Sequence, residues 1–188
     1  TEELFRYVSA ATNSSFSIQE DDRLSSVYAI YLGNEPASLN DIQFPVSKNE
    51  EAYRIYTPES GGRIFSANSP RALLYAVYDF LETSLGYRWY FPYPEDNIQP
   101  VLSEDHLKSI LQTKEDRETA PAFSFRSREF RDVSPITANT DEQSVQQIDW
   151  WAKLRMNCFL INFGFVNDKG LWERWKQRLI PEIKKRGM

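Results

Sequence analysis

The sequence predicts an α+β fold, a sheet with helices packed on it, followed by an incomplete β/α segment of barrel-like type. In the first 118 residues short strands alternate with two helices. After Pro121 the order becomes strand, helix, strand, helix. The net charge also changes, from −9 in residues 1–120 (10 basic and 19 acidic side chains) to +4 in residues 121–188 (12 basic and 8 acidic). We therefore expect two domains, residues 1–118 and 119–188.

The first domain is predicted to begin with a helix over residues 3–11, where apolar residues recur at helical spacing. Short strands are expected at residues 16–18 and 27–32, the second closed by a Gly-Asn pair. Residues 53–56 and 63–65 flank a turn that contains two consecutive glycines. This pattern predicts a β-hairpin.

The clearest element is a helix over residues 70–85, which carries one apolar stripe. Ser69 is suited to cap its free amides, Pro70 fits the first helical position, and Gly86 suits the left-handed residue that ends many helices. Residues 87–91 are rich in aromatic side chains and precede two prolines, so we expect a strand there.

The second domain is predicted to start with a strand over residues 123–130. Thr140 and Gln143 have the spacing of a capping box and open the next helix. Residues 158–163 form an apolar run that is typical of a strand buried on both faces. The last helix carries Leu171, Trp172, Trp175, Leu179 and Ile183, with a kink expected at Pro181 and an end at Gly187.

Composition excludes several classes of function. The 22 Lys and Arg against 27 Asp and Glu give a net charge of −5, so we expect neither nucleic-acid nor membrane binding. The longest apolar run, residues 158–166, is far shorter than the ~20 residues that span a bilayer. Cys158 is the only cysteine, which leaves no disulfide and no cysteine-based zinc site.

Catalytic and metal-binding motifs are absent from the sequence. The carboxylates are scattered, the single histidine, His106, lies in a polar stretch, and the Gly61-Gly62 pair lacks the Lys-Ser/Thr of a phosphate loop. We therefore assign no catalytic residue, no metal ligand and no cofactor. Trp151 and Trp175 fall on or near the apolar stripes of their helices, and we expect them to pack in the core.

Ligand-binding candidates cluster at the ends of the two predicted parallel strands. Arg126 and Arg128 lie in the C-terminal half of the first strand, and Asn162 lies at the matching end of the second. Ligands bind at this edge in parallel α/β architectures, and the arginine fork suits vicinal hydroxyls or a carboxylate. Salt bridges to neighbouring acidic groups are an equal alternative for each arginine.

Two stretches carry a family resemblance. Residues 62–92 (GRIFSANSPRALLYAVYDFLETSLGYRWYFP) resemble the small α+β domain that precedes the catalytic barrel in family 20 β-hexosaminidases and in α-glucuronidases. Residues 121–130 (PAFSFRSREF) and 148–158 (IDWWAKLRMNC) resemble the entry into that barrel. The sequence departs from the family pattern at Ala72, Ala76 and Ser127.

The resemblance implies an N-terminal part of a bacterial glycoside hydrolase, with an accessory domain and the first two units of a (β/α)8 barrel. It further implies that Arg126 contacts the sugar and that the catalytic carboxylates follow Met188. The expected partners are a carbohydrate, bound through the parent enzyme, the downstream barrel, and a second copy at the cut barrel edge. The N-terminus without Met fits a removed signal peptide and a periplasmic or extracellular protein. The alternative is a stand-alone carbohydrate-binding or scaffold module, in which Trp150, Trp172 and the arginines near the end of the first strand form a shallow ligand surface.

Overall fold

A computed structural model describes residues 1–14, 16–18, 28–33, 42–93, 95, 97–127, 140–158 and 169–188. The chain forms two compact units. The first unit comprises Thr1–Arg88 and Ile98–Ala122, and the second comprises Trp89–Asn97 and Phe123–Met188. The loop Trp89–Asn97, which interrupts the first unit in sequence, therefore belongs to the second. No sequence pattern indicated this assignment.

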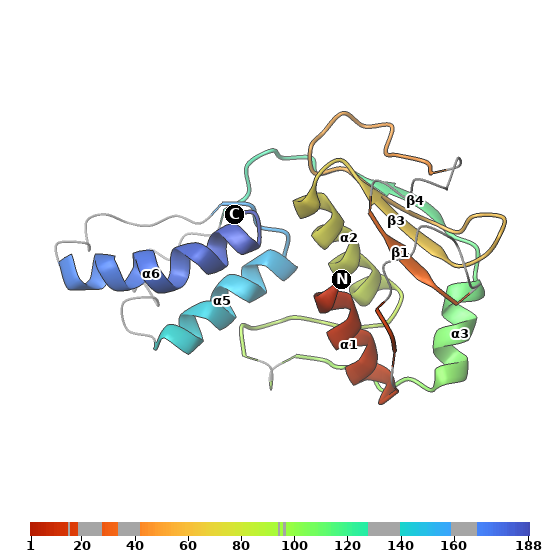
Figure 1. Ribbon diagram of the computed structural model, residues 1–188, viewed down its shortest axis with the longest axis horizontal. Helices are drawn as coiled ribbons and strands as arrows, with labels where there is room; N and C mark the ends of the chain where they lie inside the picture. Colours follow the sequence, from red (N-terminus) through yellow and green to blue (C-terminus); the bar gives the residue numbers. More distant parts are fainter. Residues whose placement is uncertain are drawn as a thin grey trace. The chain divides into compact units, whose positions relative to one another are not determined.

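The first unit contains a four-stranded mixed sheet (Figure 1). Its strands are β1 (Ile30–Leu32), β2 (Tyr53–Tyr56), β3 (Arg63–Ala67) and β4 (Asp116–Thr119), in the spatial order β1-β3-β2-β4. β2 pairs with β3 in antiparallel register, which confirms the predicted hairpin, and it also pairs antiparallel with β4. β1 pairs parallel with β3, so both sheet edges are short strands.

Three helices accompany the sheet, α1 (Glu2–Thr12), α2 (Pro70–Thr83) and α3 (Glu104–Gln112). The caps of α2 are those that the sequence predicts. The Ser69 side chain accepts a hydrogen bond from the Ala72 amide, and Gly86 adopts a φ of 88° just beyond the helix. An L side chain rarely adopts that φ, so glycine is required at this position.

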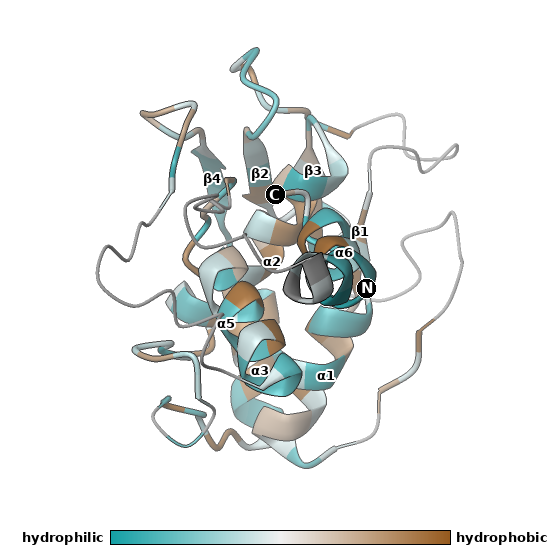
Figure 2. Cartoon of the chain, turned by 90° about the vertical axis from the view of Figure 1, so that its left-hand side faces the viewer, coloured by the Kyte–Doolittle hydropathy of each residue, from teal (hydrophilic) through white to brown (hydrophobic). Residues whose placement is uncertain are grey.

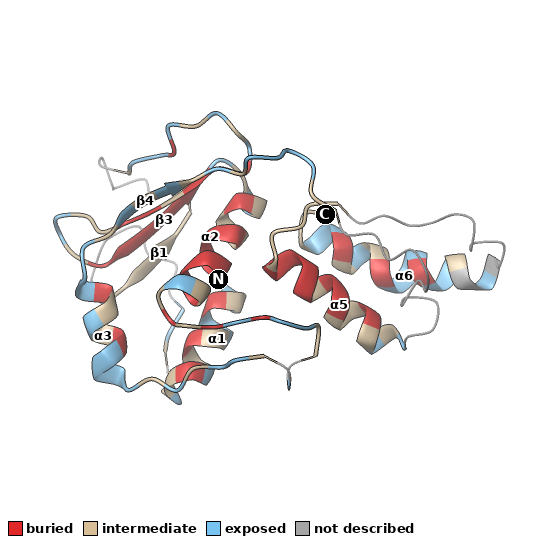
Figure 3. Ribbon diagram, turned by 180° about the vertical axis from the view of Figure 1, so that it is seen from behind, coloured by how far each residue is buried: buried red, intermediate tan, exposed pale blue. Residues whose placement is uncertain are grey.

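The core of the first unit lies between α1, α2 and one face of the sheet, as the views in Figures 1 and 3 show. α2 packs on β2 and β3, and α1 packs on α2. Completely buried side chains fill this layer, among them Ile55, Phe65, Phe80 and Leu81. The predicted helix over 3–11 and the helix over 70–85 are therefore both confirmed.

Two of the strands expected in residues 1–118 are wrong, and two elements found there were not predicted. Residues 16–18 are not a strand, and residues 87–91 contribute only one isolated bridge, between Arg88 and Ile98. The sequence did not predict α3, whose only buried residues are Leu107 and Leu111, nor β4, whose four residues are all polar. β4 forms because β2 supplies a pairing partner, which overrides its low strand propensity.

The second unit contains α5 (Asp141–Lys153) and α6 (Lys169–Lys185). The predicted capping box is present. The Thr140 side chain accepts a hydrogen bond from the Gln143 amide, and the Gln143 side chain accepts one from the Thr140 amide. α6 continues through Pro181 to the last turn, and Gly187 follows it with a φ of 71°. Residues along α5 change repeatedly between hydrophobic and hydrophilic in Figure 2, the pattern of a helix that buries part of its surface.

The two helices of the second unit share an apolar core formed by Ile148, Trp175, Leu179 and Ile183. The α+β class is confirmed, but the described residues of this unit contain no strand and no barrel. The strand expected over 123–130 is wrong for residues 123–127, which have no strand structure. Apart from Cys158, the strand expected over 158–163 lies outside the described residues. None of the described helices combines the length and the apolar character needed to cross a membrane.

Candidate functional site

The predicted ligand-binding residue Arg126 lies at a junction between two segments of the second unit. Its amide donates to the Asn157 side-chain oxygen at 2.8 Å. Its carbonyl accepts hydrogen bonds from the amides of Asn157 and Cys158, at 3.1 and 3.2 Å. The segments that precede and follow α5 are thus joined side by side at this point.

The Arg126 side chain strengthens the same junction. Its Nε donates to the Arg155 carbonyl at 2.8 Å, and one terminal nitrogen donates to the Phe123 carbonyl at 2.5 Å. Asn157 adds a bond from its side-chain nitrogen to the Ser124 carbonyl at 2.8 Å. The guanidinium therefore links the turn after α5 to residues 123–126. The sequence did not indicate this structural role.

The other two predicted ligand-binding residues, Arg128 and Asn162, lie outside the described residues. Arg126 is consequently the one member of the predicted set whose surroundings the structure describes. Two nitrogen atoms of its guanidinium donate hydrogen bonds to backbone carbonyls.

A cluster of charged side chains lies between α5 and α6. Asp149 accepts from Lys153 at 2.5 Å and from Arg186 at 3.1 Å, and Arg186 also pairs with Glu182 at 2.5 Å. Burial alone would raise the pKa of Asp149, but the two cations outweigh it and hold that pKa below its ordinary value. Two carboxylates and two cations compensate one another, and this arrangement is typical of a structural cluster.

The tryptophans are packed more completely than a sugar-stacking surface requires. Trp151 and Trp175 are each 4% exposed, which confirms that they pack in the core. Trp150, which the alternative of a binding module would place on an open surface, is buried and donates to the Trp89 carbonyl at 3.0 Å. That part of the alternative is wrong.

His106 is exposed in the first turn of α3, where its amide donates to the Ser103 side chain at 3.1 Å. Across the described part of the chain, no group of three or more His, Cys, Asp or Glu side chains has the geometry of a metal site. The amide of His106 thus takes part in a helix cap.

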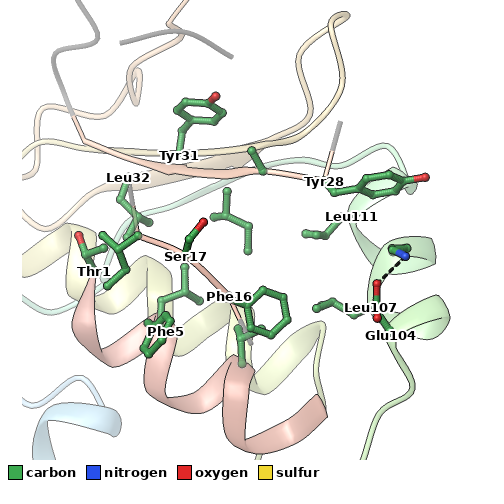
Figure 4. Close-up of a pocket in the computed structure, with 16 residues that line it drawn as sticks. Thr1, Phe5, Phe16, Ser17, Tyr28, Tyr31, Leu32, Glu104, Leu107 and Leu111 are labelled. Carbon is green, nitrogen blue, oxygen red and sulfur yellow. Dashed lines mark ion pairs between the residues drawn. The ribbon is translucent and has the colours of Figure 1, made fainter. Parts of the chain in front are cut away.

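A second candidate site, which the sequence did not reveal, is a cavity of about 660 Å³ in the first unit (Figure 4). α1, β1, α3 and residues 16–18 form its walls. Successive residues of β1 alternate, so that Leu32 points into the cavity and Tyr31 points away from it. The helices contribute apolar pairs at i and i+4, Leu4 with Val8 and Leu107 with Leu111, all of them buried.

Polar groups gather at the α3 end of the cavity. Glu104 and Lys108 form an ion pair at 2.6 Å, and the Lys108 ammonium lies 5.8 Å from the centroid of the Tyr28 ring. The hydrogen bond to Glu104 raises the pKa of Lys108. Gln112 donates to the Tyr28 hydroxyl at 3.1 Å. The cavity therefore has apolar walls and one polar end whose charges balance.

Comparisons of the chain with protein-family models, with curated proteins and with solved structures find no match.

Proposed function

We propose that the chain is part of a glycoside hydrolase, in which residues 1–118 form an accessory α+β domain and residues 119–188 begin the catalytic barrel. The observation that carries the proposal is the junction at Arg126. It joins the segments on either side of α5 at the place where the family resemblance puts the first and second barrel strands. The α+β architecture of the first unit is compatible with the accessory domain that the resemblance implies.

We propose that the backbone contact at the junction is part of a β-α-β crossover, although residues 123–127 form no strand. In such a unit the second strand returns beside the first and parallel to it, and a helix lies between them in sequence. The amides of Asn157 and Cys158 reach the Arg126 carbonyl across 31 and 32 positions of sequence that include α5. In barrels of this type, side chains at the carboxyl ends of the strands bind the substrate. Arg126 and Arg128 belong to that end of the predicted first strand.

Hydrolysis by this route requires a pair of carboxylates on either side of the scissile bond, or a substrate group that replaces one of them. Asp149 and Glu182 do not meet the requirement, because both are engaged in ion pairs with cations of the same helical pair. In keeping with the family resemblance, we propose that the reacting carboxylates lie outside residues 1–188.

A panel of aryl glycosides that includes uronides and N-acetyl sugars tests the proposal. The complete gene product that contains these residues is expected to release the aryl group from at least one of them, and the 188-residue chain from none. Turnover by the 188-residue chain, or no turnover by the complete product on any member, would contradict the proposal.

A second candidate, a carbohydrate-binding module without catalysis, is favoured by the aromatic loop of the second unit. Tyr90 and Phe91 are 55% and 57% exposed. The Asn97 side chain closes this loop through bonds to the Phe91 amide and carbonyl at 3.3 and 3.0 Å and to the Tyr93 carbonyl at 2.8 Å. Exposed aromatic rings are suited to stack on sugar faces.

Sugar binding by the 188-residue chain distinguishes the two candidates. If the chain is a binding module, saturation-transfer NMR detects a bound glycan, and Phe91→Ala abolishes the signal. Phe44→Ala, which removes a ring of the first unit that is 47% exposed, leaves the signal unchanged. Binding of this kind, together with an inactive complete product, would replace the first candidate by the second.

A further inference from the structure

We propose that the cavity of the first unit binds an uncharged amphiphile, with a medium-length alkyl chain between α1, β1 and α3 and a hydroxyl-bearing head group at the Glu104–Lys108 end. This inference does not rest on the glycosidase function, because the cavity lies entirely in the first unit. Neither the family resemblance nor the charge pattern of the sequence indicates it.

The size and the walls of the cavity fit a small apolar ligand. Protein interiors are close-packed, with few voids larger than a water molecule, whereas ligand sites occupy about 300–1,000 Å³. The cavity measures about 660 Å³ and therefore falls in the second class. Its floor is formed by the buried side chains of Leu4, Val8, Leu107 and Leu111. Such a surface attracts an alkyl chain because each methylene group that leaves water contributes to binding.

The side chains at the margin of the cavity also indicate an opening to solvent. Phe5, Ile18 and Tyr28 line it and are 38%, 49% and 43% exposed. Three large apolar side chains that line one cavity are thus partly exposed to water. An inserted chain covers part of this surface, which adds to the binding free energy.

The charges at the α3 end select the head group. Glu104 and Lys108 neutralise each other and offer one acceptor and one donor to a hydroxyl group. A charged head group gains no net attraction from this balanced pair and loses more hydration than a hydroxyl group on leaving water. An uncharged head group therefore fits this end of the cavity best.

A series of straight-chain alcohols tests the alkyl site. Displacement of the fluorescent probe N-phenyl-1-naphthylamine from the 188-residue chain measures each affinity. Binding is expected to strengthen about fourfold with every added methylene group from pentanol to octanol, the ratio that corresponds to ~0.8 kcal/mol per group. No probe binding, or affinities that do not change with chain length, would overturn the proposal.

A matched pair of variants locates the binding. Ser17 lines the cavity and its side chain points toward β1, so Ser17→Trp fills the space without removing a buried group (Figure 4). We expect it to weaken octanol at least tenfold. Ser60→Trp, at an exposed turn away from the cavity, is expected to change the affinity less than twofold. If both variants bind octanol as the wild type does, the cavity is not the site.

A second pair keeps the test valid if Ser17→Trp fails to fold, which circular dichroism would reveal. Phe5→Ala removes a ring that lines the cavity, and Phe44→Ala removes one that does not; the two rings are 38% and 47% exposed. Only Phe5→Ala is expected to weaken octanol, by roughly three- to tenfold. Equal effects of the two variants would overturn the assignment.

The head group is tested with octan-1-ol against octanoate at pH 7. We expect octanoate to bind more weakly, because its carboxylate loses more hydration than a hydroxyl group and gains no net attraction from the balanced Glu104–Lys108 pair. Glu104→Gln leaves the charge of Lys108 unbalanced and should narrow the difference in affinity. Tighter binding of octanoate than of octanol to the wild type would refute the uncharged head group.

Discussion

Among the described residues of the first unit, Arg63 is the most completely buried charge, and its replacement gives the sharpest test of how that unit is held together. The side chain is 1% exposed in β3. It forms an ion pair with Glu115 and donates to the carbonyls of Ile110 and Thr113 at 2.8 and 3.0 Å. One guanidinium therefore ties the end of α3 and the segment before β4 to the centre of the sheet. Arg63→Met keeps an unbranched apolar stem and removes every donor.

The expected loss follows from these contacts. Burial lowers the pKa of Arg63, so its charge is costly to bury, and methionine recovers part of that cost. Against this, two carbonyls and a carboxylate lose their donor, and removing one partner of a buried pair typically costs 3–5 kcal/mol. Glu115 keeps Arg117 at 3.1 Å, which limits the damage. We expect a loss of about 3 kcal/mol, a large share of the 5–15 kcal/mol typical of a folded domain.

Urea unfolding followed by circular dichroism measures this change. Arg54→Met is the matched control, because Arg54 also pairs with an acidic side chain, Asp116 at 2.8 Å, but the partner is 61% exposed. Exposed pairs contribute about 0–1 kcal/mol, so the control should lose less than 1 kcal/mol. A loss below 1 kcal/mol for Arg63→Met, or equal losses for both variants, would refute the reasoning.

Three further predictions concern stability. Asp149→Asn should destabilise the chain at neutral pH, and the difference in stability from the wild type should shrink in acid. Lys153 and Arg186 hold the pKa of Asp149 below its ordinary value, so the stabilisation by the carboxylate is complete above pH 3.8 and is lost as the pH falls through the lowered pKa. Urea midpoints that differ equally at pH 7 and pH 2 would contradict this prediction. Thr140→Ala removes the N-cap of α5 and should cost about 1 kcal/mol in urea unfolding, whereas an unchanged midpoint would disprove the cap. Gly86→Ala meets no atom within 4 Å but must adopt a φ of 88°, so thermal unfolding should show a loss of about 1 kcal/mol, and a gain would disprove the strain.

Sequence reasoning succeeds where one segment contains its own signals. The helix α2 has an apolar stripe, a serine cap, a proline in the first turn and a glycine beyond the end, and all of them lie within residues 69–86. The capping box of α5 is equally local. Such elements are predictable because their start, their buried face and their end are all specified by neighbouring residues.

Prediction from the sequence fails where the structure of a segment depends on a partner that is distant in the chain. β4 has the sequence Asp-Arg-Glu-Thr, which has no apolar pattern, and it is a strand because it pairs with β2 from Tyr53↔Thr119 to Tyr56↔Asp116. The reverse holds for residues 87–91, whose aromatic side chains predict a strand that finds only one bridging partner. Strand formation depends on a pairing partner, and the sequence of one segment does not contain it.

The same contrast between local signals and distant partners applies to the candidate sites. Arg126 was identified from its place in a predicted strand, but its bonds to Arg155 and Phe123 depend on the turn after α5. The cavity could not be predicted, because the apolar pairs on α1 and α3 look like ordinary core residues. Only their separation in space leaves room for a ligand.

The central claim is that the chain belongs to a glycoside hydrolase, and the most direct measurement is the turnover number of the complete gene product on aryl glycosides. Typical enzymes turn over about 1–10³ times per second on a good substrate, far above the rate of spontaneous hydrolysis. We predict release of the aryl group at such a rate from at least one glycoside, with none from the 188-residue chain under the same conditions. A complete product that hydrolyses no glycoside, or a 188-residue chain that hydrolyses one, would contradict the claim.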